Sequence, residues 1–177
     1  VYDCNRPPLA ADAMPYQSEA ITVPGNQNLT AEQRQERVES YYEPFHAALA
    51  ETIAATAMPV IVTIHSFTPI YHGKTRVVEI GVLHDSDTRL ADVMLDCAHD
   101  HTDRLVERNK PYGPEHGVTH TLKEHALVNG HLNVMLEVRN DLIQTAQQQD
   151  EMADCIANWL ADALVQLKVE GAVACQA

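Results

Sequence analysis

Residues 60–76, VIVTIHSFTPIYHGKTR, decide the fold class of this chain. The stretch begins with five β-branched residues, 60–64, and such an unbroken run suits a strand that is covered on both faces of a sheet. His65 ends the run, and a polar turn that contains proline follows it. We therefore predict a buried strand that delivers an imidazole to the edge of a sheet.

Helical and extended patterns alternate on both sides of this strand. Thr30-Ala-Glu-Gln33 matches a capping box, which predicts a helix that starts there and runs to about Ala57. Further strands are expected at 77–83 and 132–138, and further helices after Asp85 or Ser86, at 119–128 and at 147–168. Residues 7–29, which hold four of the nine prolines, are expected to form a long ordered loop beside the site. The alternation predicts a three-layer α/β/α fold around a mixed, mostly parallel sheet.

The length and composition fit a single globular domain that covers residues 1–177, with 45% hydrophobic and 21% charged residues. The net charge of −13 repels phosphate backbones and anionic lipids, so we expect no nucleic-acid and no membrane partner. Four separated cysteines, Cys4, Cys97, Cys155 and Cys175, form no C-x-x-C pair. They favour reduced thiols and a cytoplasmic location.

Polar side chains end three apolar runs. Asn5 and Arg6 follow VYDC, which reads as the end of a strand, and His65 follows residues 60–64. Glu137 and Arg139 stand at the end of LNVMLEVR. Sites in open α/β sheets form at the carboxyl ends of strands, so we expect these side chains to converge on one rim. The alternative is that polar strand ends serve only solubility.

His65 and Glu137 carry the chemistry of this prediction. A neutral imidazole is a metal ligand or a general base. A carboxylate inside an apolar run must be paired, protonated or bound to a metal, because its burial alone is costly. Near a metal, Glu137 would take a proton from water; the alternative is a salt bridge to Arg139 or to another buried arginine. The ten histidines form no H-E-x-x-H motif, so the metal site is incomplete.

Seven motifs, in order along the chain, resemble those of the N-formylglutamate amidohydrolase family. They are YDCNRPP, VPGNQNLT, YYEPFHAAL, VTIHSFTP, KTRVVEIGVLHDSDTRLAD, ERNKPYG and NVMLEVRNDLI. The resemblance implies a fold similar to that of zinc carboxypeptidases. It also implies a zinc-dependent hydrolase that cleaves the N-acyl amide of an acidic amino acid, and thus binds a small anionic substrate. N-formylglutamate, which yields formate and glutamate, is the simplest case.

The resemblance also implies roles for single residues. His65 looks like a zinc ligand, and Glu137 resembles the carboxylate that activates metal-bound water. Asn5 and Arg6 resemble the pair that holds the carboxylate of the substrate. Further substrate contacts are expected from an arginine in KTRVVEIG, from a loop tyrosine in NKPYG and from the arginine after Glu137, which are Arg76, Tyr112 and Arg139.

The chain departs from the family pattern at its start. Family members have an additional amino-terminal region whose histidine motif supplies further zinc ligands, so the remaining Zn²⁺ ligands are expected upstream of Val1. Two other readings stay open. One is a deacylase for a different N-acyl amino acid or small peptide, and the other is a metal-free binding protein of the same fold.

Overall fold

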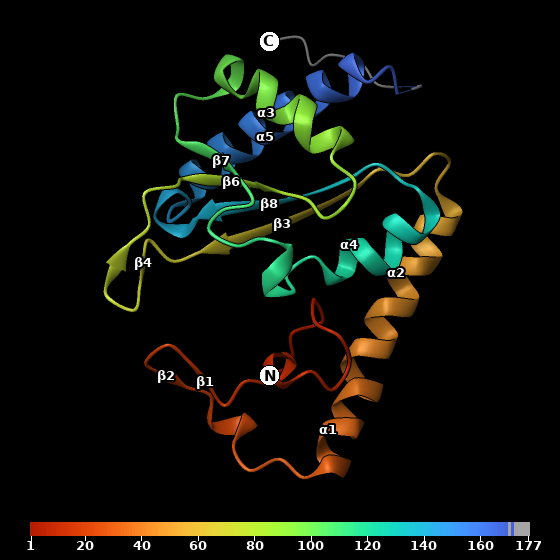
Figure 1. Cartoon of the computed structure of the whole chain (residues 1–177), viewed down its shortest axis with the longest axis vertical. Coiled ribbons are helices and arrows are strands. Elements are labelled where there is room, and N and C mark those ends of the chain that lie inside the picture. Colours follow the sequence, from red (N-terminus) through yellow and green to blue (C-terminus); the bar gives the residue numbers. More distant parts are fainter. Residues whose placement is uncertain (170, 172–177) are drawn as a thin grey trace.

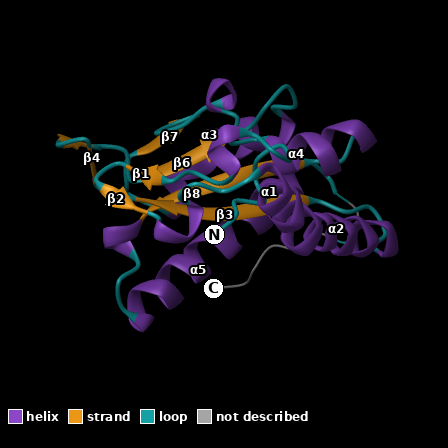
Figure 2. Ribbon diagram, turned by 90° about the horizontal axis from the view of Figure 1, so that it is seen from below, coloured by secondary structure: helices purple, strands orange, loops and turns teal. Residues whose placement is uncertain are grey.

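Four strands form the central sheet of the computed structural model, which describes residues 1–169 and 171. Their order is β3 (Ile61–Phe67), β8 (Asn133–Arg139), β6 (Ile80–Leu83) and β7 (Val106–Arg108), as Figures 1 and 2 show. β3 runs parallel to β8 and β6 runs parallel to β7, whereas β6 and β8 are antiparallel. The sheet is therefore mixed, as predicted.

Helices cover both faces of this sheet, which confirms the α/β prediction. α3 (Arg89–His101) and α5 (Ala146–Gln166) pack on one face, around a core that includes Leu90, Met94, Leu136 and Trp159. The indole Nε1 of the fully buried Trp159 donates to the carbonyl oxygen of Met94 at 2.7 Å and so ties α5 to α3. On the other face, α4 (His120–His125) and the end of α2 (Glu43–Ala55) pack over a smaller apolar cluster.

The residues before α2 form a separate layer below the sheet, red to orange in Figure 1. This layer contains the hairpin β1 (Gln17–Ser18) and β2 (Ile21–Thr22), and α1 (Ala31–Arg37). Short helices stand at Ala11–Ala13 and Pro24–Asn26, and a π-helical turn, Val38–Tyr42, joins α1 to α2. The predicted capping box is present, because Gln33 N donates to Thr30 Oγ1 and Thr30 N donates to Gln33 Oε1.

Short elements connect the main ones. The hairpin β4 (Ile70–Tyr71) and β5 (Lys74–Thr75) follows β3. Single 3₁₀ turns stand at Pro114–His116, Leu127–Asn129 and Asn140–Leu142. The predicted helix 119–128 is thus an α-helix up to His125 and a 3₁₀ turn after it.

Two predicted strands differ from the structure. VYDC is not the end of a strand: residues 1–3 have no regular structure, and Asp3 N donates to the carbonyl of Ala13 within the lower layer at 2.8 Å. The strand expected at 77–83 begins only at Ile80. The carbonyl oxygens of residues 76–78 accept hydrogen bonds from the guanidinium of Arg139 instead of from a neighbouring strand.

The described residues can also be examined for membrane-spanning helices and for free thiols. No helix in this part of the chain is long and apolar enough to cross a membrane. Cys4, Cys97 and Cys155 carry free thiols, and Cys175 lies outside the described residues.

Candidate active site

His65 and Glu137 lie side by side at the ends of two parallel strands. They occupy the same register position, His65 on β3 and Glu137 on β8. Paired residues of neighbouring strands point to the same face of a sheet, and here both line a cavity of about 410 Å³ on the α4 face. Asn5, Arg6 and Tyr112 line the same cavity. The structure therefore brings five of the seven sequence-predicted site residues into one cavity.

Glu137 is a buried carboxyl group without a full set of partners. Its exposed fraction is 4%, and its Oε2 atom has no hydrogen-bond partner among the described residues. Burial raises the pKa of Glu137 to about 7, although the positive charges of Arg76 and Arg6 oppose the rise. A carboxyl group with this pKa both accepts and releases a proton near neutral pH, which is what a general acid–base catalyst requires.

His65 is held in the form that binds a metal or accepts a proton. Burial lowers the pKa of its imidazole, while Asp3 raises it and Arg6 lowers it further. The ring is therefore neutral at neutral pH, with one nitrogen lone pair available. A catalytic zinc site normally has three protein ligands.

The residues present fit a part of such a zinc site. The neutral imidazole and the unpaired carboxylate oxygen of Glu137 suit a metal ion. However, within residues 1–169 and 171 no three His, Cys, Asp or Glu side chains are placed to hold one together. The described residues alone do not complete the site.

Asn5 fastens the N-terminal loop to α4. Its Oδ1 accepts from the backbone N and the hydroxyl of Thr121, at 3.0 and 2.8 Å, and its Nδ2 donates to the carbonyl of Val118 at 2.6 Å. These three bonds use both ends of the amide. Asn5 thus presents the next residue, Arg6, to the cavity.

Arg6 is oriented by its own neighbours. Its Nε donates to the carboxylate of Asp12 at 2.7 Å, and its Nη1 donates to the carbonyl of Asn5 at 2.9 Å. Its Nη2 makes no hydrogen bond to any described residue, so one edge of the guanidinium remains available. A planar guanidinium is well suited to bind a carboxylate.

Arg76 is enclosed by aromatic rings. Its guanidinium carbon lies 4.4 Å from the ring centroid of Tyr71, 4.9 Å from that of Tyr112 and 5.5 Å from that of Phe67. Its Nη2 donates to the hydroxyl of Tyr112 at 2.9 Å. Cation–π contacts of this kind fix the position of the charge without neutralising it.

Tyr112 reaches the site because its loop crosses closely over the sheet. The backbone oxygen of Lys110 would lie only 1.8 Å from a Cβ atom at position 81, where the chain has glycine. Gly81 pairs with Glu137 across β6 and β8, so the loop passes directly beside the candidate base. A side chain at this position is incompatible with the observed path of the loop.

Arg139 lies beside the cavity and not on its lining. Its Nε donates to Asp141 Oδ1 at 2.8 Å, and its Nη1 donates to the carbonyl of Arg76 at 3.3 Å. Its Nη2 lies 3.5 Å from Glu79 Oε1. In this arrangement Arg139 holds the segment that carries Arg76, and direct substrate binding by Arg139 stays a prediction.

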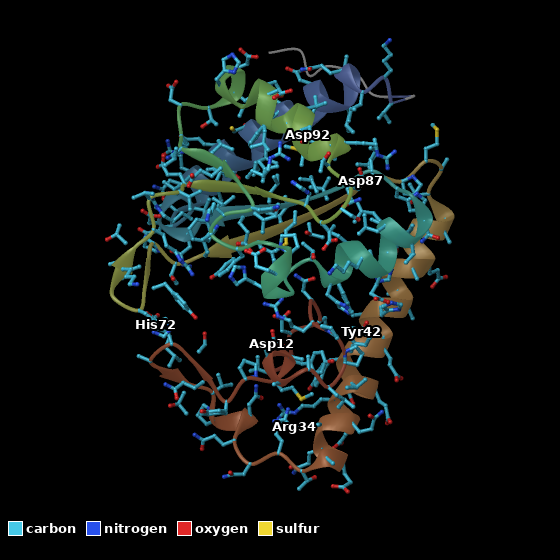
Figure 3. The ribbon with its side chains drawn as sticks, in the orientation of Figure 1. Asp12, Arg34, Tyr42, His72, Asp87 and Asp92 are labelled. Carbon is cyan, nitrogen blue, oxygen red and sulfur yellow. The ribbon has the colours of Figure 1, made fainter. Side chains whose placement is uncertain are left out.

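Several cavity residues had not been singled out in the sequence. They include Asp3, Asp12, Glu19 and Tyr71, of which Asp12 and Glu19 belong to the loop 7–29. The carboxylate of Glu19 accepts a hydrogen bond from the backbone N of His72 at the tip of the β4–β5 hairpin, which faces the β1–β2 hairpin in Figure 3. The proline content of the loop predicted that it lies beside the site. It did not predict which of its side chains face the cavity.

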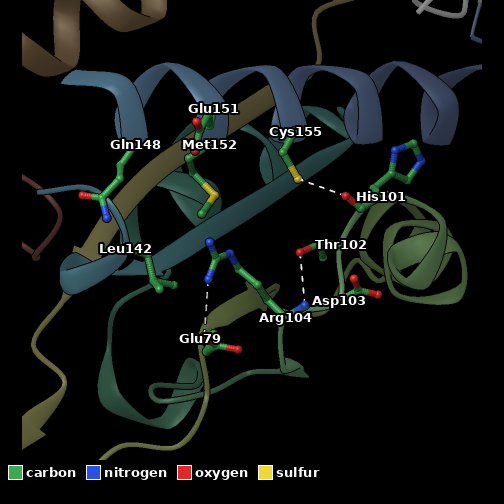
Figure 4. A pocket seen from close by; sticks show the side chains of 10 residues that line it. All are labelled: Glu79, His101, Thr102, Asp103, Arg104, Leu142, Gln148, Glu151, Met152 and Cys155. Carbon is green, nitrogen blue, oxygen red and sulfur yellow. Dashed lines mark hydrogen bonds and ion pairs between the residues drawn. The ribbon is translucent and has the colours of Figure 1, made fainter. Parts of the chain in front are cut away.

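A larger cavity, of about 590 Å³, lies between α5 and the end of α3 (Figure 4). Its polar groups are largely engaged with one another: Arg104 pairs with Glu79 at 3.5 Å, and Cys155 Sγ donates to the carbonyl of His101 at 3.4 Å. Burial raises the pKa of the Cys155 thiol, which keeps it protonated and unreactive. The cavity at the ends of β3 and β8, which holds the unpaired carboxyl oxygen of Glu137, is therefore the stronger candidate for an active site.

Known proteins indicate which family the chain belongs to. No curated protein matches the chain. The crystal structure of gene product Atu2144 from Agrobacterium tumefaciens is 50% identical, with a TM-score of 0.90 over 94% of this chain and 68% of that chain. The N-formylglutamate amidohydrolase of Ralstonia eutropha JMP134 shares the fold, at 17% identity and a TM-score of 0.58 over 94% of this chain and 73% of that chain. The family model of N-formylglutamate amidohydrolase matches residues 1–144, and the chain belongs to this family.

Proposed function

We propose that the protein hydrolyses the N-acyl amide of an amino acid, with N-formylglutamate as the simplest substrate and Glu137 as the general base. Membership in the family supports an amide-cleaving hydrolase. The observation that carries the finer assignment is the buried Glu137, whose Oε2 lacks a partner among the described residues and which pairs in register with a neutral His65.

Glu137 would move the protons of the reaction. In its ionised form it accepts a proton from the attacking water, and in its protonated form it returns that proton to the leaving amine. A pKa of about 7 serves both steps, because the two forms are then similarly populated at neutral pH. General acid–base catalysis of this kind contributes about 10²–10⁴-fold to the rate.

Two arginines would bind and polarise the substrate. We assign the free Nη2 edge of Arg6 to the carboxylate of the substrate. We assign Arg76 to the oxyanion of the tetrahedral intermediate, because its charge already acts on Glu137 and its position is fixed by three aromatic rings. Preorganised donors of this kind are worth about 10²–10³-fold in turnover.

Zinc is part of the proposal, with His65 as one of its ligands. The further ligands would have to come from outside the described residues, because these contain no group of three suitable side chains. When bound, zinc supplies Lewis-acid polarisation to hydrolysis. The proton transfers and substrate contacts assigned above belong to residues of this chain.

Formate release from N-formylglutamate, measured together with zinc content, tests the proposal. Wild-type protein should contain about one zinc per chain and release formate, and His65→Ala should lose both. The matched control is Glu151→Gln, which alters an exposed glutamate in the cavity beneath α5 and should change neither.

Three outcomes would contradict parts of the proposal. Zinc without formate release would point to another N-acyl amino acid or a small peptide as the substrate. Absence of both metal and hydrolysis would support a binding protein. Loss of activity in the Glu151→Gln control would indicate that the active site is instead the cavity between α5 and the end of α3.

A further inference from the structure

Three histidines form a cluster where α2 passes α4 (Figure 1). His46 stands on α2, and His120 and His125 stand at the two ends of α4. The ring centroids of His46 and His125 lie 4.3 Å apart. His120 Nε2 lies 2.9 Å from the hydroxyl oxygen of Tyr42, the residue that precedes α2. None of the three histidines lines the cavity at Glu137, so the proposed hydrolysis does not explain this histidine cluster.

The histidine cluster is closed to water. His120 and His125 are 9% and 5% exposed, and the gap that the cluster lines has no room for a water molecule. Burial lowers the pKa of both imidazoles, and positive charge on His46 acts in the same direction. The packing suits uncharged rings, because two imidazolium ions at 4.3 Å would repel each other with no water between them.

Few charges are placed to balance a proton on the cluster. Among the described residues that line the gap, Glu124 is the only one with a carboxylate, and it is exposed to solvent. Its charge favours protonation of His120 and His125, whereas Arg6 of the lower layer and Lys123 of α4 oppose protonation of His120. The remaining titratable residues at the gap stay neutral near pH 7, since burial raises the pKa of each: Cys4 and Tyr42.

Polar contacts attach the lower layer to α4. The apolar side chains of this layer form a cluster of their own, separate from the two clusters that cover the sheet. Asn5 accepts two hydrogen bonds from Thr121 on α4, and Tyr42 is hydrogen-bonded to the neighbouring His120. Arg6 directly follows Asn5, so the same attachment sets where Arg6 stands in the cavity at Glu137.

We infer that the histidine cluster is an acid-sensitive joint, which positions Arg6 by docking the lower layer onto α4 and releases the layer when the rings are protonated. The inference goes beyond the proposed function, and only its consequence for substrate binding rests on that function.

The direction of the pH effect follows from proton linkage. Released imidazoles regain the ordinary histidine pKa of about 6.5, whereas the docked rings of His120 and His125 have lower values. Docking is therefore fully stable above about pH 6.5 and weakens as the pH falls towards the lower values. Each proton that is taken up on release weakens docking by about tenfold per pH unit in this range.

Hydrogen exchange of one backbone amide reports the docking. The N–H of Thr121 lies in the first turn of α4, where a helix provides no backbone acceptor, and it donates to Asn5 Oδ1 at 3.0 Å. Its protection factor, measured by NMR against the intrinsic rate at the same pH, should fall between pH 7.5 and 5.5. The expected fall is about tenfold for one proton and about a hundredfold for two. The indole N–H of Trp159, bound to Met94 on the other face of the sheet, should keep its protection within about threefold.

Variants without the titrating rings test the cause. In the double variant His120→Gln/His125→Gln, the protection of Thr121 should differ by less than about threefold between the two pH values. Because both rings are buried, His46→Gln at a half-buried position gives a second measurement with less risk to folding. It removes one repelling charge, so the fall should be at least about threefold smaller than in the wild type. His99→Gln, which removes an exposed histidine on α3, is the matched control and should show the full wild-type fall.

Three results would overturn the inference. One is equal protection of Thr121 at both pH values in the wild type. Another is a fall of wild-type size in the double variant or in His46→Gln, since a proton bound elsewhere would then cause the release. The third is a parallel fall for the amide of Thr121 and the indole of Trp159, because acid would then unfold the whole molecule and not open one joint.

Hydrogen exchange needs no substrate, which separates this inference from the proposed function. If neither the wild type nor His46→Gln hydrolyses N-formylglutamate, the proposed function fails, and the protection of Thr121 still decides whether the joint exists. If both hydrolyse it, KM at pH 5.5 should be at least about threefold lower in His46→Gln, with kcat less affected, because Arg6 stays docked. Equal KM values would refute the role of the joint in positioning Arg6.

Discussion

Replacing Glu137 by glutamine should stabilise the protein at high pH. Burial raises the pKa of Glu137 from 4.5 to about 7, so the folded state holds a proton that the unfolded state has lost between these two pH values. Wild-type stability is therefore fully present below pH 4.5 and falls as the pH rises towards 7. At about 1.4 kcal/mol for each unit of pKa, the loss is about 3 kcal/mol. Glutamine has nearly the same shape and no proton to lose, so this part of the pH dependence should vanish.

Urea unfolding of both proteins at pH 4.5, 6 and 8, with a chelator to keep the protein metal-free, measures this difference. The free energy of unfolding of Glu137→Gln, relative to wild type, should rise by about 3 kcal/mol between the lowest and highest pH. The change with pH matters here, since any constant packing difference between the two side chains cancels. If the free energy of unfolding changes with pH in the same way in both proteins, burial does not raise the pKa of Glu137. The argument for Glu137 as a general base would then lose its physical basis.

Three further substitutions test the supports of the site. Gly81→Ala should destabilise the fold by about 1–3 kcal/mol and lower kcat/KM, because its Cβ meets the Lys110 oxygen; an unchanged melting temperature would contradict this. Trp159→Phe should cost about 1–3 kcal/mol in urea unfolding and leave kcat unchanged, since it acts on the other face of the sheet; loss of activity at full stability would contradict it. Arg139→Gln should lower kcat, because it frees the carbonyl of Arg76; steady-state kinetics that show only a higher KM would indicate direct substrate binding by Arg139 instead.

Much of the fold follows from local patterns in the sequence. The β-branched run at 60–64, the capping box at Thr30 and the helical spacing around Trp159 each predict elements that the structure contains. The strand directions do not follow from such patterns. β6 runs antiparallel to β8, and its own residue pattern would fit either direction. The start of β6 at Ile80 goes with hydrogen bonds from Arg139 to the segment before it, and Arg139 is distant in sequence.

The residues at the centre of the candidate site, His65 and Glu137, could be singled out in the sequence for a physical reason. His65 and Glu137 each end or interrupt an apolar run, and a polar group in such a place needs a chemical explanation. That His65 and Glu137 lie directly opposite each other depends on how β3 pairs with β8, which the pattern of each strand alone does not determine. The acidic residues around Arg6 and the aromatic rings around Arg76 come from loops and hairpins, whose side-chain directions depend on tertiary contacts that spacing along the chain does not encode.

The turnover number of Glu137→Gln with N-formylglutamate tests the central claim most directly. It would be measured as formate release at pH 7.5, on protein whose cooperative unfolding shows that it is folded. The account predicts a loss of at least about 100-fold, because the only buried carboxyl group beside His65 in the described structure would no longer accept a proton. Turnover within about threefold of the wild type, a difference far below that of a lost general base, would contradict it.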